Sequence, residues 1–248
     1  MKSEDFLSNL SRNLGRESEG KLTPDVTTHL SLNEEQVKAR ARRIADDIAA
    51  RADELMTSFE RTAAGAAWNV FRTTSAQDAA SYIRQVAQDV EARTMLRSDH
   101  NTLENLDIEN AMRGTGISLE IMALDDARGG LTAEDERSRL RQKAIVADIG
   151  ITGVDYAIAE TGSCVLLPRK GLSRVISLLP PVHVAVVESG QVLPSLDELF
   201  TLRREDFLNG DLGSYMNLVS GPSRSADIEY QLVTGVHGPG EVHVILLG

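Results

Sequence analysis

Cysteine is nearly absent from this sequence. Of its 248 residues only Cys164 is a cysteine, and the five histidines show neither an HExxH motif nor an i, i+4 pair. One thiol cannot form an intrachain disulfide, and it cannot supply the set of thiolates that holds zinc or an iron–sulfur cluster. We therefore expect no metal site and no bound cofactor in this chain, so that any redox metal belongs to a partner.

Aromatic residues, positive charge and long apolar runs are also scarce. Phe, Trp and Tyr make up 4% of the chain, and 37 acidic against 26 basic residues give a formal net charge of -11. The charge repels phosphate backbones and anionic membranes, and nothing suggests an aromatic platform for bases. No run reaches the ~18 to 20 apolar residues that cross a bilayer, and the first residues lack the apolar core of a secretory signal. We expect a cytoplasmic protein with no membrane span and no nucleic-acid partner.

The 42% of hydrophobic residues is enough for a sizeable core. We divide the chain into residues 1–64, an N-terminal arm followed by one long helix, and residues 65–248, an α/β domain. The helix begins at a capping-box pattern at Asn33, and apolar residues then recur at intervals of three and four up to Gly65.

Beyond Gly65, short apolar runs typical of strands alternate with helical patterns. The expected strands are Trp68–Arg72, Thr94–Ser98, Ile117–Leu124, Asp155–Ala159, Cys164–Leu167, Val184–Val187 and Val242–Leu247. This alternation predicts a parallel or mixed sheet flanked by helices, with the helix of the first 64 residues as an extension.

An acidic turn separates two of the expected strands. It consists of Glu160, Thr161, Gly162 and Ser163. A carboxylate at the end of a strand in an open α/β sheet stands where ligands bind, and it could act as a nucleophile or a general base. Alternatively, Glu160 caps the turn by accepting backbone N–H bonds. Glu160 is thus a candidate catalytic residue, and the next three residues are candidate ligand contacts.

A basic turn and a histidine follow. The segment Arg169–Arg174 places three cations around a glycine. This composition is suited to binding a carboxylate or a phosphate, so Arg169 and Arg174 are candidate anion contacts. The alternative is a solvated basic turn. His183 follows two prolines and precedes a strand, where an imidazole could shuttle a proton near neutral pH. It is the second candidate catalytic residue, unless it is a half-buried histidine bonded to backbone.

The segment Gly221–Glu229 predicts a turn into the N-terminus of a helix, capped by Ser223 or Ser225. Because helix N-termini bind anions, Ser223 and Arg224 are candidate anion contacts. Simple capping is the alternative, since Asp227 already offers negative charge to the helix dipole.

Several long motifs occur together and in order. They are FLSNLSRNLGR near the N-terminus, GITGVDYAIAETGS, LSRVISLLPPVHVAVV and GPSRSADIEYQLVTGVHGPGEVHVILL. In these residues the chain resembles the LUD-domain family, densely in roughly its last hundred residues and earlier through the arm and the strand–helix alternation.

The resemblance implies a fold similar to the sugar-phosphate isomerase and CoA-transferase group. It also implies a role in oxidising L-lactate to pyruvate within a three-protein system whose other members carry iron–sulfur clusters. On this hypothesis the chain is a non-redox subunit, its partners are iron–sulfur lactate utilization proteins, and its ligand is a small 2-hydroxy acid or related anion. Glu160, Arg174 and His183 occupy motif positions, and their chemical roles are our hypothesis.

A second hypothesis is a stand-alone enzyme that uses Glu160 as the nucleophile of an acyl or CoA transfer, or one that acts on sugar phosphates. It rests on the analogy of fold, since CoA transferases place a glutamate before a small turn with glycine. Their usual asparagine is Thr161 here, which weakens the analogy. Homo-oligomers are compatible with either hypothesis.

Overall fold

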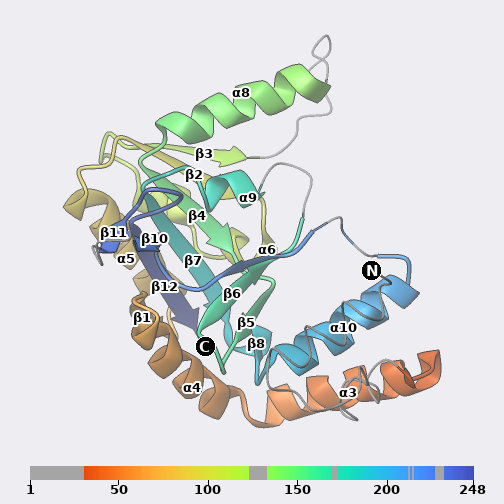
Figure 1. Ribbon diagram of the computed structural model, residues 1–248. Coiled ribbons are helices and arrows are strands. Elements are labelled where there is room, and N and C mark those ends of the chain that lie inside the picture. The colour runs from red at the N-terminus through yellow and green to blue at the C-terminus, as the bar shows by residue number, and fades with distance from the viewer. Residues whose placement is uncertain (1–30, 123–132, 169–172, 212, 214, 227–231) are drawn as a thin grey trace.

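A sheet of six parallel strands forms the centre of the computed structural model, which describes residues 31–122, 133–168, 173–211, 213, 215–226 and 232–248 (Figure 1). The strand order is β1-β12-β7-β4-β2-β3. The bounds are β1 Asn69–Thr73, β2 Thr94–Ser98, β3 Ser118–Met122, β4 Ile149–Gly153, β7 Val182–Glu188 and β12 Glu241–Leu247. The predicted α/β architecture with a parallel sheet is confirmed.

Helices cover both faces of this sheet. On one face lie α5 (Ala76–Asp89), α6 (Asn101–Glu104) and α7 (Ile108–Ala111); on the other lie α8 (Ala133–Val146) and α9 (Ser173–Ile176). Strands β4 and β7 are buried almost throughout, and for that reason their sequences do not alternate regularly between apolar and polar residues.

A smaller sheet packs on the same face as α8 and α9. Its order is β8-β5-β6-β9, and its bounds are β5 Tyr156–Ile158, β6 Ser163–Leu166, β8 Val192–Leu193 and β9 Asn217–Val219. A short 3-10 turn, η1 (Ser189–Gln191), connects β7 to β8. The turn with Glu160 joins β5 to β6, which pair antiparallel. Glu160 is therefore not at the carboxyl edge of the parallel sheet, and the prediction that placed it there is wrong.

The predicted single long helix is wrong, because the structure has two. α3 (Glu34–Ala50) and α4 (Ala52–Gly65) are separated at Arg51, whose φ of -119° and ψ of 19° are not helical. The predicted capping box at Asn33 is confirmed. α3 packs against α10 (Leu196–Leu208), and both α3 and α4 contribute side chains to the core that contains the smaller sheet. The expected N-terminal arm lies outside the described residues.

The chain after Gly221 also differs from the prediction. Arg224–Ala226 is a strand, β10, which pairs antiparallel with β11 (Leu232–Thr234), so the predicted helix N-terminus does not form at Ser223 or Ser225. Serine favours both helix caps and irregular segments, and here Ser223 precedes a strand and Ser225 lies within it. Within the described ranges, no helix combines the length and the hydropathy needed to span a membrane.

Candidate ligand-binding site

The acidic turn packs tightly against the end of α4. Gly162 has a φ of +65°, and a Cβ at this position would lie 2.5 Å from the backbone nitrogen of Ala63. Thr62 Oγ1 donates a hydrogen bond of 2.8 Å to the carbonyl oxygen of Ala159. The glycine of this motif is therefore required for the close approach of helix and turn.

The segment before β10 reaches the same place. Ser163 Oγ and Ser220 Oγ are 2.6 Å apart, and Thr161 Oγ1 donates to Ser163 Oγ at 2.8 Å. Gly221 has a φ of +94° and lies against Ala66. A Cβ on Gly221 would be 2.1 Å from the carbonyl oxygen of Ala66. Two motifs that are some sixty residues apart in sequence thus meet at the end of one helix.

The amides of the acidic turn are already bonded within the protein. Glu160 N donates to the carbonyl oxygen of Pro194, and the N–H groups of Thr161 and Gly162 both donate to that of Ile158. The Glu160 side chain is exposed, and its carboxylate has no hydrogen-bond or ion-pair partner among the described residues. The turn thus offers a carboxylate to solvent, but its own amides are not free to hold an anion.

Arg224 binds the protein backbone. Its Nη2 donates a 2.6 Å hydrogen bond to the carbonyl oxygen of Ala66, the residue that ends α4. A cation at this position stabilises the negative end of the helix dipole. Ser223 is also engaged, since its Oγ accepts from the backbone N–H of His237 at 3.1 Å. Both predicted anion contacts therefore have structural partners.

His183 lies inside the protein, beneath the smaller sheet. It is fully buried on β7, and its Nε2 is 2.8 Å from Thr152 Oγ1 of the adjacent strand β4. Burial, with a smaller contribution from the nearby charge of His243, lowers the pKa of His183 to about 3. The imidazole is therefore neutral near pH 7. Its hydrogen-bond partner is a side chain, whereas the sequence had suggested either a proton shuttle or a bond to the backbone.

Arg174 lies on α9, close to the strand that neighbours His183. Gly150 of β4 is the register partner of His183, and a Cβ on Gly150 would lie 2.0 Å from the carbonyl oxygen of Ile176. The backbone of α9 therefore covers this part of the sheet. The Arg174 guanidinium is 5.7 Å from the centroid of the Tyr215 ring. Arg169, the other predicted cation, lies outside the described residues.

A polar cluster at the carboxyl ends of β2, β4 and β7 was missed in the sequence. His100 Nε2 lies 3.6 Å from Asp155 Oδ1, with side chains 7% and 9% exposed. Thr102 N donates to His100 Nδ1 at 3.2 Å, and Thr102 Oγ1 donates to Glu188 at 3.1 Å. The available signal was position, since these polar residues follow buried strands within a few residues. The cluster thus joins the ends of three neighbouring strands through contacts between polar side chains.

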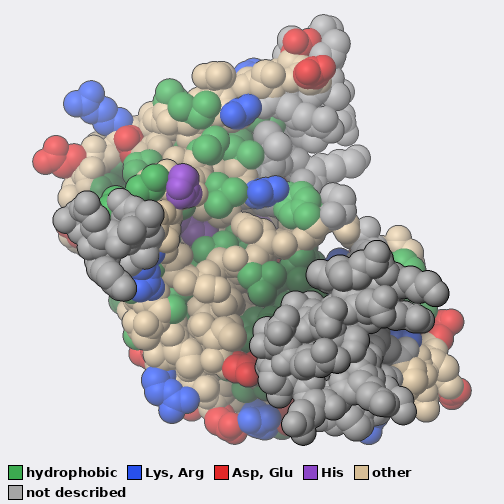
Figure 2. Space-filling model, in the orientation of Figure 1, with side chains coloured by type: hydrophobic (Ala, Val, Ile, Leu, Met, Phe, Trp, Pro, Cys, Tyr) green, Lys and Arg blue, Asp and Glu red, His purple; other side chains and the backbone are tan. Residues whose placement is uncertain are grey.

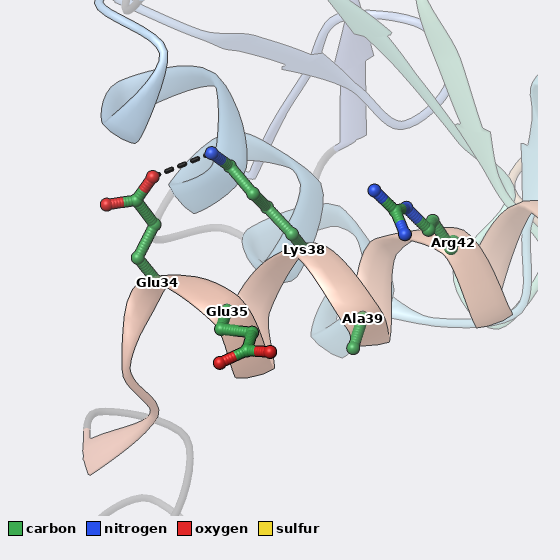
Figure 3. Close-up of a pocket in the computed structure, with 5 residues that line it drawn as sticks. All are labelled: Glu34, Glu35, Lys38, Ala39 and Arg42. Carbon is green, nitrogen blue, oxygen red and sulfur yellow. Dashed lines mark hydrogen bonds and ion pairs between the residues drawn. The ribbon is translucent and has the colours of Figure 1, made fainter.

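A surface pocket lies elsewhere, on α3 (Figure 3). It has a volume of about 520 Å³ and is lined by Glu34, Glu35, Lys38, Ala39 and Arg42. Lys38 and Glu34 form an ion pair of 2.6 Å across one helical turn. On the face of the molecule in Figure 2, the described acidic and basic side chains are interspersed. The described side chains of that face do not form the continuous basic stripe that is typical of a nucleic-acid-binding protein.

The architecture defines an α/β protein in which a parallel sheet carries helices on both faces and a second small sheet on one. Residues 55–247 match the LUD domain, and the chain belongs to the LUD-domain family. The match begins within α4, the helix against which the two motifs meet.

Individual relatives agree with this assignment. The chain is 28% identical to lactate utilization protein C of Oceanobacillus iheyensis over 98% of this chain and 96% of that protein. It is 45% identical to lactate utilization protein C of Halalkalibacterium halodurans over 42% of this chain, a match that spans 46% of the relative's length. The crystal structure of a DUF162 family protein from Deinococcus radiodurans superposes with a TM-score of 0.51, at 18% identity, over 79% of this chain and 98% of that one. This last likeness shows the fold alone.

Proposed function

We propose that this chain is a subunit of a cytoplasmic system that oxidises L-lactate to pyruvate, and that it contributes no redox centre of its own. The observation that carries the proposal is the relationship to a lactate utilization protein C that extends through nearly the whole of both chains. The iron–sulfur clusters of the system then reside in partner proteins.

The chemistry of the single cysteine supports this division of work. Cys164 is fully buried, and burial raises the pKa of its thiol, so that it does not form the thiolate that ligates metals. An iron–sulfur cluster usually takes four thiolates, and the chain has one thiol. The electrons removed from lactate therefore pass to a partner.

We place a small 2-hydroxy acid next to α9, with its carboxylate at the exposed side of this helix. Arg174 is the carboxylate contact, because a guanidinium binds a carboxylate through two parallel hydrogen bonds and Arg174 is exposed. His183 contributes a neutral ring nitrogen. The acidic turn and Arg224 fix the end of α4 behind this site, a supporting role in place of direct contact.

A CoA transferase that uses Glu160 is the second candidate. The exposed carboxylate of Glu160 favours it, since a nucleophile must reach its substrate. Two features weigh against it: the amides around the turn are already bonded, and Thr161 replaces the asparagine that CoA transferases usually have. A purified chain that exchanges CoA between acids, and that loses this activity in Glu160→Gln, would overturn the first candidate.

Co-purification from cells grown on lactate tests the proposal. We expect the tagged full chain to recover cysteine-rich iron–sulfur proteins together with lactate-dependent dye reduction. In the recovered complex, Arg174→Gln should raise the KM for lactate about tenfold or more, because a charged hydrogen bond to the carboxylate is lost. The matched control is Arg113→Gln, an exposed arginine next to α7 on the other face of the sheet. A chain that is recovered alone and inactive contradicts the proposal.

A further inference from the structure

Two buried ring nitrogens near the end of α4 have no hydrogen-bond partner among the described residues. They are Nε1 of Trp68 and Nδ1 of His183. Trp68 is 4% exposed and His183 is fully buried, and their ring centroids are 6.1 Å apart with the planes inclined by 56°. Buried polar atoms in native proteins almost always have a partner, so each of these two nitrogens is suited to a polar atom that the described residues do not supply.

The second nitrogen of His183 decides what kind of atom fits. Nε2 is 2.8 Å from Thr152 Oγ1, and a threonine hydroxyl can either accept or donate a hydrogen bond. If the hydroxyl accepts from Nε2–H, Nδ1 carries a lone pair and accepts. If the hydroxyl donates to Nε2, Nδ1 carries the proton and donates. His183 can therefore present either role at Nδ1 without a change of charge.

We propose that Trp68 and His183 together bind the C2 oxygen of a 2-hydroxy acid and of the matching 2-oxo acid, and that Thr152 lets His183 exchange roles between the two. This rests on the proposed function and names how its site holds substrate and product. A hydroxyl accepts from Trp68 Nε1–H and donates to Nδ1, whereas a carbonyl oxygen accepts from both rings. The inference concerns binding alone, and no bond is made or broken in it.

The surroundings of His183 suit such a neutral switch. The imidazole stays uncharged near pH 7, because its burial disfavours the protonated form. The helix that carries Arg174 covers Gly150, the register partner of His183, and we assign the carboxylate of either acid to this arginine. Because both rings are buried, the covering segments must move when a ligand enters, and association should be slower than for a preformed open site.

Trp68 is the only tryptophan in the chain, so its fluorescence reports on the site directly. The full chain is titrated with L-lactate, with pyruvate and with propionate, which lacks the C2 oxygen. We expect a saturable change with lactate and pyruvate, and binding of propionate weaker by about tenfold or more, since it leaves both ring nitrogens unpaired. No response to lactate or pyruvate at millimolar concentrations would mean that the two nitrogens serve no such ligand.

Two substitutions of His183 form a matched pair. His183→Gln keeps a polar atom near Nε2, facing Thr152, but removes Nδ1, so the response to both acids should be lost. His183→Asn keeps a polar atom near Nδ1, and the response should persist. Circular dichroism and thermal melting establish that both variants fold. Equal responses in the two variants contradict the inference.

A measurement on the unsubstituted chain does not depend on whether a variant folds. Nitrogen-15 NMR of labelled histidine distinguishes the two neutral tautomers of His183. We expect the Nε2–H form with lactate bound and the Nδ1–H form with pyruvate bound. One unchanged tautomer in both complexes would overturn the switch. Co-purification with iron–sulfur partners should be unaffected in His183→Gln, so a failure of this inference is separable from a failure of the proposed function.

Discussion

At the scale of single residues, His183 couples stability to pH. The pKa of His183 is about 3 in the folded protein, whereas a histidine in the unfolded chain has an ordinary pKa near 6.5. Between these values the unfolded state binds more protons, so stability is complete above about pH 6.5 and falls as the pH is lowered toward 3.

We therefore expect His183→Gln to reduce the acid sensitivity of the protein. At pH 5 the wild-type histidine costs about 2 kcal/mol relative to pH 7, and glutamine, which does not titrate, removes this cost. Urea unfolding at the two pH values measures it as the change in the free energy of unfolding. If both proteins lose the same stability between pH 7 and pH 5, His183 is not the group responsible.

Ala67 is a second residue whose conformation has a measurable cost. It follows α4 with a φ of +66°, and the N–H of Trp68 reaches back to the carbonyl oxygen of Ala63, as in a Schellman motif. Glycine adopts this conformation without strain. Ala67→Gly should therefore raise the free energy of unfolding by about 1 kcal/mol, whereas Ala64→Gly, inside the helix, should lower it by about 0.5–1 kcal/mol. Equal effects at the two positions would show that the helix end is not strained.

At the scale of elements, the contact between α4 and the β5–β6 turn depends on a missing side chain. In Gly162→Ala the new Cβ meets the backbone of Ala63 and the residue keeps a positive φ, so we expect a loss of about 3 kcal/mol. Gly190→Ala is the control, because nothing lies within 4 Å of its Cβ, and the change should stay within about 0.5 kcal/mol. Chemical denaturation compares the two, and a tolerated Gly162→Ala would show that helix and turn can separate freely.

Elements were predictable where local chemistry and packing agree. The capping box at Asn33 and the strand Thr94–Ser98 were expected with the bounds that the structure has, because each is specified by adjacent residues. The pairing of β10 with β11 was not expected from the sequence. The composition of Gly221–Glu229 also suits the start of a helix, and whether Arg224–Ala226 forms a strand depends on a partner further along the chain. The break at Arg51 was missed because apolar spacing continues through it.

The candidate site was predicted only in part, for a related reason. Sequence identified the acidic turn and the segment with Arg224, but it could not show that both contact the end of α4, because these contacts join distant residues. Trp68 was placed in an expected strand, and its nitrogen, unpaired among the described residues and near His183, is evident only in three dimensions.

At the scale of the whole molecule, α3 belongs to the folded domain although the family match begins after it. Ile44 and Ile48 lie in the core that contains the smaller sheet, and Arg204 of α10 donates 2.6 Å to the carbonyl oxygen of Leu32. Removal of residues 1–50 should lower the melting temperature by about 10 °C or more, because several apolar side chains lose their burial. Differential scanning calorimetry measures this, and an unchanged melting temperature would make α3 a dispensable extension.

The position of β12 has a consequence for synthesis. The main sheet places residues 241–247 between β1 and β7, so β1 finds its neighbour only when those residues have been synthesised. Until then, β7 has an open edge that a ribosome-bound chain cannot fill, and such edges invite pairing with other chains. The order of translation thus separates the synthesis of β1 and β7 from the pairing that joins them, and during this interval the open edge of β7 favours association with other chains.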